Sequence, residues 1–241
     1  MKRYISVFEM IARSSIYKVL LTIGLMLVAE AVCFYMSMIS PSGLGIESYI
    51  DQSQYPLIFK IAYILITIAI VLPGMNIGSK QTYTLQRLRI KEKRIYWLQV
   101  IYNFFAYILL WGAQLVMLFV NILVYQKYLP EGAVVTNQTF VMAFYRNAFM
   151  HTMLPLEDGP GWWILVLFGV TSALATAETT KLQRERKFGI ELVLILAAAM
   201  ISFPRALGYD VAFPLIALAI IYCVMGTRWL ISAVGNGGDE S

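Results

Sequence analysis

The chain has 241 residues, of which 59% are hydrophobic and only 14% are charged, and its formal net charge is +5 at pH 7. Soluble domains carry about 25% charged residues. This composition therefore excludes an ordinary water-soluble protein and indicates an integral membrane protein.

The N-terminal 17 residues precede the first long apolar stretch and have an amphipathic pattern. On a helical wheel one arc is apolar and consists of Tyr4, Ile5, Val7, Phe8, Ile11 and Ala12. Residues 1–17 are therefore predicted to form a helix lying on the inner membrane surface. A cytoplasmic extension of the first span is the alternative. Because Glu9 and Arg13 interrupt the apolar positions, a secretory signal is not expected.

Six apolar stretches follow, and a helix needs about 20 residues to cross the ~30 Å hydrocarbon core. They are residues 18–40, 57–78, 98–125, 161–180, 189–204 and 211–230, of which the fifth is the shortest. We predict an all-α membrane domain of six transmembrane helices over residues 18–234, with a short tail at 235–241. Little chain is left for a soluble catalytic domain, so we do not expect an enzyme.

The basic residues predict the orientation of these spans. Six of them lie in one connection, the segment 79–97: Lys80, Arg87, Arg89, Lys91, Lys93 and Arg94. Lys and Arg near spans resist translocation, so this segment is expected in the cytoplasm, together with both termini. Of the 19 Lys and Arg residues, the exceptions assigned to the outer side are Lys60, Lys127, Arg146 and Arg205. The positive charge is thus a topology signal, and no nucleic-acid partner is expected.

The connection 126–160 is expected on the outer side and is too long to be a plain link. Its residues 138–150 mix bulky apolar and polar side chains, which favours a short helix at the outer interface. Trp162 and Trp163 then mark re-entry at head-group depth.

No metal, cofactor or catalytic site is expected in this chain. Cys33 and Cys223 both fall inside spans, and the lone His151 lies in the outer connection. A membrane hydrolase is not expected, because the spans contain no paired aspartates and the sequence has no hydrolase motif. Glu178 stands alone near the inner end of the fourth span.

Glu30 is the charged residue that lies deepest in a predicted span, near the middle of the first one. A carboxylate is costly there unless it is protonated, paired or in contact with water. Lys60, near the outer end of the second span, is placed to lean toward it. Gln114 and Asn121 lie two turns apart on the third span and form a polar stripe. Two interpretations stay open for this set: helix-to-helix hydrogen bonding, or a polar part of a transport pathway.

Taken together, these features resemble the permease subunits of type-2 ABC exporters. The motif that carries the resemblance is the basic segment, in which residues 84–95 read Thr-Leu-Gln-Arg-Leu-Arg-Ile-Lys-Glu-Lys-Arg-Ile. In that family a Leu-Pro-Val-Ser/Thr segment followed by basic residues marks the region that seats on the ATPase. Here Arg89 and Lys91 occupy the positions where the family often has Pro and Ser or Thr.

The resemblance implies a cytoplasmic ABC ATPase partner, which would dock on Arg87, Leu88, Ile90, Lys91 and Glu92 and would itself bind ATP and Mg²⁺. It also implies a second permease copy or homologue, a multi-pass location in a bacterial plasma membrane, and an amphipathic cargo such as an antimicrobial peptide, drug or lipid. Glu30, Gln114 and Asn121 would then line the substrate pathway. The alternatives are a non-transporting scaffold or sensor subunit that docks a soluble partner, and a proton-coupled secondary carrier that uses Glu30.

Overall fold

The computed structural model describes residues 2–39, 45–75, 92–128, 137–156, 158–184 and 217, and within them it is almost wholly helical and has no strand. The helices are α1 (Lys2–Ile39), α2 (Ile46–Gln52), α3 (Tyr55–Met75), α5 (Glu92–Lys127), α6 (Asn137–Arg146), α7 (Ala148–Met153) and α8 (Gly159–Arg184). The expected spans at 189–204 and 211–230, the tail, and most of the segment 79–97 lie outside the described residues.

Four of these helices, α1, α3, α5 and α8, are long and apolar enough to cross a membrane. They overlap the first four spans expected from the sequence. The described part of the chain is thus all-helical, as predicted, and contains four helices that could span a membrane. The total of six spans stays a prediction.

Proline and backbone conformation help to set where two of the long helices begin. Pro56 and Pro160 each stand in the first turn, at α3 and α8 respectively. A first-turn proline is tolerated because its missing N–H would have no partner in the helix. Between α2 and α3, Gln54 has a φ of 56°, in the left-handed region, which lets the chain leave one helix and enter the next within a few residues.

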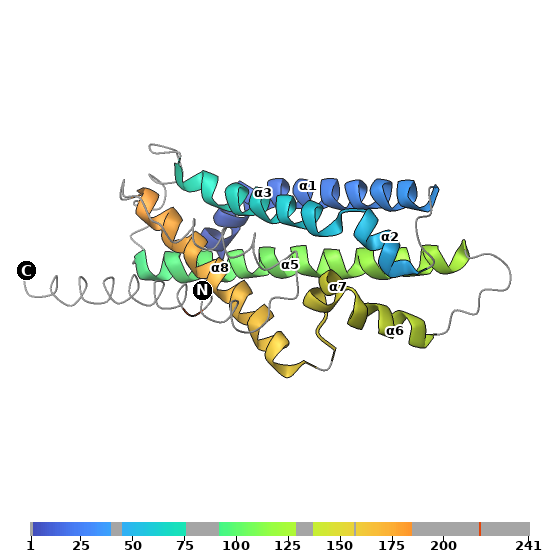
Figure 1. Cartoon of the computed structure of the whole chain (residues 1–241). Helices are drawn as coiled ribbons and strands as arrows, with labels where there is room; N and C mark the ends of the chain where they lie inside the picture. Colours follow the sequence, from blue (N-terminus) through green and yellow to red (C-terminus); the bar gives the residue numbers. More distant parts are fainter. Residues whose placement is uncertain are drawn as a thin grey trace, which may run out of the picture.

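The four long helices alternate in direction along the chain (Figure 1). α1 and α5 run in the same direction, since Ser15 contacts Tyr102 near their starts and Glu30 contacts Gln114 further along. α8 runs opposite to α5, because Asn103 bonds Thr176, near the end of α8, whereas Trp111 packs against Trp162, near its start. The starts of α1 and α5 and the ends of α3 and α8 therefore lie at the same end of the bundle.

The N-terminal segment is not a separate helix, because α1 is continuous from Lys2 to Ile39. Part of its apolar arc packs on protein: Val7 is fully buried, and the ring of Phe8 meets that of Tyr102 edge-on at 6.2 Å. The Ser15 hydroxyl also donates to the Tyr102 hydroxyl at 2.8 Å. The backbone thus follows the alternative in which residues 1–17 extend the first span, while their position relative to the membrane surface stays a prediction.

The connection between α5 and α8 contains two short helices, α6 and α7, where one was expected over residues 138–150. Asn147 separates them and caps α7, its side-chain oxygen accepting from the backbone N–H groups of Phe149 at 3.1 Å and Met150 at 3.0 Å. The Asn147 amide also donates to Asp51 of α2 at 2.8 Å. One side chain therefore starts a helix and joins the two connections at this end of the bundle.

Small side chains let α8 pack closely against α3 and α5. Its buried positions are mainly alanine, serine and threonine: Thr171, Ser172, Ala173, Ala175, Thr176 and Ala177. Small residues are typical of helix contacts inside membranes, where van der Waals packing and hydrogen bonds replace the hydrophobic effect.

Candidate functional site

Glu30 lies in the interior of the bundle, where α1 packs against α3 and α5. Both Glu30 and Gln114 are fully buried, and the Gln114 Nε2 group donates to Glu30 Oε2 at 3.1 Å. A charged carboxylate is expensive in such a place unless a cation or several donors balance it. Within the described residues, no Lys or Arg pairs with Glu30.

Each partner of this hydrogen bond keeps one buried oxygen without a donor. These atoms are Glu30 Oε1 and Gln114 Oε1, and neither has a hydrogen-bond partner among the residues that the structure describes. A carboxylate offers only acceptors, whereas a protonated carboxyl group adds one O–H donor. The surroundings of Glu30 therefore lack a donor, and either a proton on the carboxyl group or a cationic ligand would supply the missing interaction.

Tyr55 and Asn121 extend the polar cluster toward the start of α3. The Asn121 amide donates to the Tyr55 hydroxyl, and that hydroxyl lies 3.4 Å from the backbone carbonyl oxygen of Glu30. Tyr55 and Asn121 are also buried. The structure thus brings together Glu30, Gln114 and Asn121, the three pathway residues predicted from the sequence, and adds Tyr55, which the sequence analysis missed.

Lys60 does not approach Glu30 in the way the sequence suggested. It is half-buried on α3, and the structure shows no ion pair between these two described residues. Tyr55 and Lys60 are five positions apart, which turns their side chains about 140° from one another around a helix of 3.6 residues per turn. Because Tyr55 faces Glu30, Lys60 faces elsewhere.

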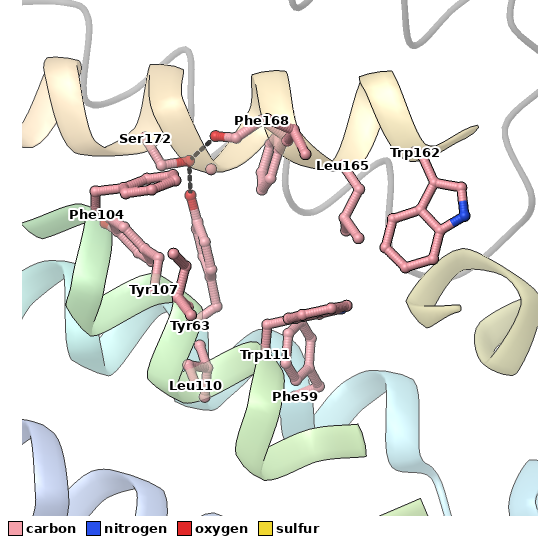
Figure 2. Close-up of a pocket in the computed structure, with 13 residues that line it drawn as sticks. Phe59, Tyr63, Phe104, Tyr107, Leu110, Trp111, Trp162, Leu165, Phe168 and Ser172 are labelled. Atoms are coloured by element: carbon pink, nitrogen blue, oxygen red, sulfur yellow. Dashed lines mark hydrogen bonds between the residues drawn. The ribbon is translucent and has the colours of Figure 1, made fainter. Parts of the chain in front are cut away.

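A second polar layer joins α3, α5 and α8 closer to the end where α8 finishes. The Tyr63 and Ser172 hydroxyls share a hydrogen bond, drawn in Figure 2, and lie 2.7 Å apart. The Thr67 and Tyr107 hydroxyls lie 3.0 Å apart. The rings of Tyr63 and Tyr107 stack at 5.3 Å.

Further along α8, Glu178 forms a buried ion pair with Lys181 at 3.7 Å. The expectation that Glu178 stands alone is therefore wrong. Lys181 comes directly after the span expected at 161–180, and the structure shows it buried within the last turn of α8.

Most of the expected ATPase-docking residues are beyond the part of the chain that the structure describes. Arg87, Leu88, Ile90 and Lys91 fall in that gap, and Glu92 is the first residue of α5. The described helix ends on either side of this gap, the end of α3 and the start of α5, both lie at the end of the bundle where α1 begins (Figure 1).

Among the described residues, no group of three or more His, Cys, Asp or Glu side chains is placed to hold a metal ion. No protein-family model, curated protein or solved structure matches the chain.

Proposed function

We propose that the chain is a transmembrane subunit of an ABC exporter, located in a bacterial plasma membrane with its termini in the cytoplasm. A separate cytoplasmic ATPase, which binds ATP and Mg²⁺, would drive it through the basic segment 79–97. A second permease copy or homologue would complete the pathway. The cargo would be amphipathic, such as an antimicrobial peptide, a drug or a lipid.

The observation that best supports this proposal is the continuity of α5. This helix begins at Glu92, within the basic segment, and extends without a break past Gln114 and Asn121. A single element thus connects the expected docking surface to the buried polar cluster around Glu30. Such a connection is what a subunit moved by an external motor requires.

A proton-coupled secondary carrier is the second candidate, and the surroundings of Glu30 favour it. The buried carboxyl group has no cationic partner among the described residues and keeps one oxygen without a donor. Protonation would let the carboxyl group donate a hydrogen bond, and release of the proton would leave that oxygen without a partner again. This function needs no ATPase partner.

Purification with native partners separates the two candidates. The exporter proposal expects an ATPase to copurify with the wild-type chain, and expects the double variant Leu88→Asp/Ile90→Asp to lose it while remaining folded in the membrane. Apolar anchors in the centre of an interface carry much of the binding energy, so two buried charges there are costly. Leu156→Asp is the matched control, because Leu156 is 40% exposed and lies in the connection at the opposite end of the bundle.

If no ATPase accompanies the wild-type chain, the exporter proposal is wrong. Export that then follows a proton gradient would support the carrier. A soluble partner that copurifies without any transport would support a scaffold.

A further inference from the structure

A cavity of about 270 Å³ lies between α3, α5 and α8. Its lining is mostly aromatic and includes Phe59, Phe104, Trp111, Trp162, Leu165 and Phe168 (Figure 2). The Tyr63 and Ser172 hydroxyls also line it, but they bond to each other at 2.7 Å. A ligand that fits here would therefore be apolar and uncharged over the part that enters the cavity.

The cavity opens at an exposed apolar surface between α5 and α8. Ile108 of α5 and Val166 of α8 are both lining residues, and they are 41% and 47% exposed. In a helix that spans a bilayer, an exposed apolar side chain faces lipid tails. A ligand can thus enter sideways, between α5 and α8, without passing through water.

The dimensions of the cavity suit a chain rather than a single ring. A cavity of about 150 Å³ already accommodates benzene, so this one is larger than a single ring needs. The lining extends along α8 from Trp162 to Ser172, a rise of ~15 Å at about 1.5 Å per residue. That length is half of the ~30 Å hydrocarbon core, which is the depth of one leaflet.

Trp162 gives the cavity its position in depth. It stands near the start of α8. Tryptophan side chains are enriched at the membrane–water interface, so Trp162 is expected at that depth. The other end of the lining, at Ser172, then lies near the bilayer centre. We propose that this cavity holds one acyl chain of a membrane phospholipid, from the leaflet on the Trp162 side, as a bound rather than a freely exchanging lipid. The inference rests on the membrane-spanning character of the helices and does not depend on the exporter or carrier function.

Photo-crosslinking tests this proposal on the full chain. The protein is reconstituted in phosphatidylcholine vesicles containing a trace of phosphatidylcholine with a diazirine at the middle of one acyl chain. After illumination, the labelled residues are mapped by mass spectrometry. We expect label to concentrate on lining residues such as Phe104 and Leu165, above exposed residues of α5 outside the cavity such as Leu109 and Val116, which are 47% and 61% exposed.

Two valines of α8 give a matched pair of variants. Val166 lines the cavity, whereas Val170 is 37% exposed and does not. Val166→Trp should reduce the label on the lining residues several-fold, and Val170→Trp should leave it unchanged. If Val166→Trp does not fold, Gly169→Leu is used in its place, and Gly169→Ala is the control for that variant. A Cβ at Gly169 meets only the Phe104 ring, at an ordinary contact distance of 3.6 Å, so the alanine should be tolerated.

Three results would overturn the proposal. Label spread evenly over the exposed apolar residues would mean that the cavity holds no particular lipid. Lining residues that stay unlabelled would mean that the cavity is covered, for example by another part of this chain or by a second copy. If neither Val166→Trp nor Gly169→Leu reduces the label on the lining residues, the acyl chain that labels them is not bound inside the cavity.

Discussion

Gln114 and Glu30 join two helices that run in the same direction, through a buried hydrogen bond of 3.1 Å between Nε2 and Oε2. α1 and α5 are parallel and are separated in the chain by α2 and α3, so no short connection holds them together. Their packing therefore depends on side-chain contacts such as this hydrogen bond. Within the described ranges, one side-chain oxygen of each residue has no hydrogen-bond donor. Stability and function can therefore be separated at this pair by substitution.

Glu30→Gln should leave the protein at least as stable as the wild type. A glutamine at position 30 brings an amide donor that can reach Gln114 Oε1, and it removes the cost of burying a charge. Glu30→Leu should instead lower the free energy of unfolding by about 1–3 kcal/mol, because it leaves the Gln114 amide without a partner. Thermal unfolding in detergent measures both effects. The double variant Glu30→Leu/Gln114→Leu should recover part of the loss, and no recovery would contradict this account of the pair.

Transport should respond to Glu30→Gln in the opposite way to stability. The variant keeps the shape of the side chain but cannot ionise, so a role in meeting a cationic cargo or a proton is lost. We expect export by reconstituted protein to fall about tenfold or more, which is the effect of losing about 1.4 kcal/mol of favourable interaction. Gln114→Glu/Glu30→Gln, which moves the carboxyl group to the facing helix, tests whether its exact place matters. Normal export by the single variant would assign Glu30 a purely structural role.

Asn147 should prove more sensitive than its exposed neighbours, because it caps α7 and bonds Asp51 at once. Asn147→Ala removes both interactions and should cost about 1–2 kcal/mol. Asn147→Asp keeps a capping oxygen but sets a second carboxylate against Asp51. The swapped pair Asn147→Asp/Asp51→Asn restores one donor and one acceptor and should recover most of the stability. Thermal unfolding of the four proteins gives the comparison, and a swapped pair no better than Asn147→Asp would show that the contact with Asp51 contributes little.

The orientation of the bundle can be tested with cysteines at its two ends. Arg13, whose side chain is 77% exposed, lies at the end where α1 begins, and Tyr128, which is 66% exposed, follows α5 at the other end. The charge distribution predicts that a membrane-impermeant thiol reagent labels Arg13→Cys only from the cytoplasmic side and Tyr128→Cys only from outside. A background with Cys33 and Cys223 replaced by Ala serves as the control. Labelling of Tyr128→Cys from the cytoplasm would reverse the predicted topology.

Much of the polar cluster could be predicted from the sequence because each member interrupts an apolar stretch. Glu30, Gln114 and Asn121 are conspicuous for that reason, since a polar side chain in a span needs a partner. Tyr55 gives no such signal. It is aromatic, it stands where a connection meets a span, and its contact with Glu30 depends on how α1 and α3 are aligned along one another. Length and hydropathy do not determine that alignment.

The helix boundaries show the same limit. The existence of four long helices follows from composition, but the continuity of α1 through Lys18 does not, because a charged side chain marks a change of surroundings without breaking the backbone. The break at Asn147 was likewise unforeseen. Asparagine occurs inside helices and is favoured at their starts. Its bond to Asp51, a residue 96 positions away, could not be read from the local pattern.

The length of α5 has a mechanical consequence. From Glu92 to Gln114 the helix rises ~33 Å at about 1.5 Å per residue, and the structure shows no break in it. An unbroken helix transmits a push or a tilt along its axis with little loss, much as a rod does. A small displacement of the first turn of α5 would therefore move Gln114 by nearly the same amount. That movement would change the distance between Gln114 Nε2 and Glu30 Oε2 and so strain their hydrogen bond.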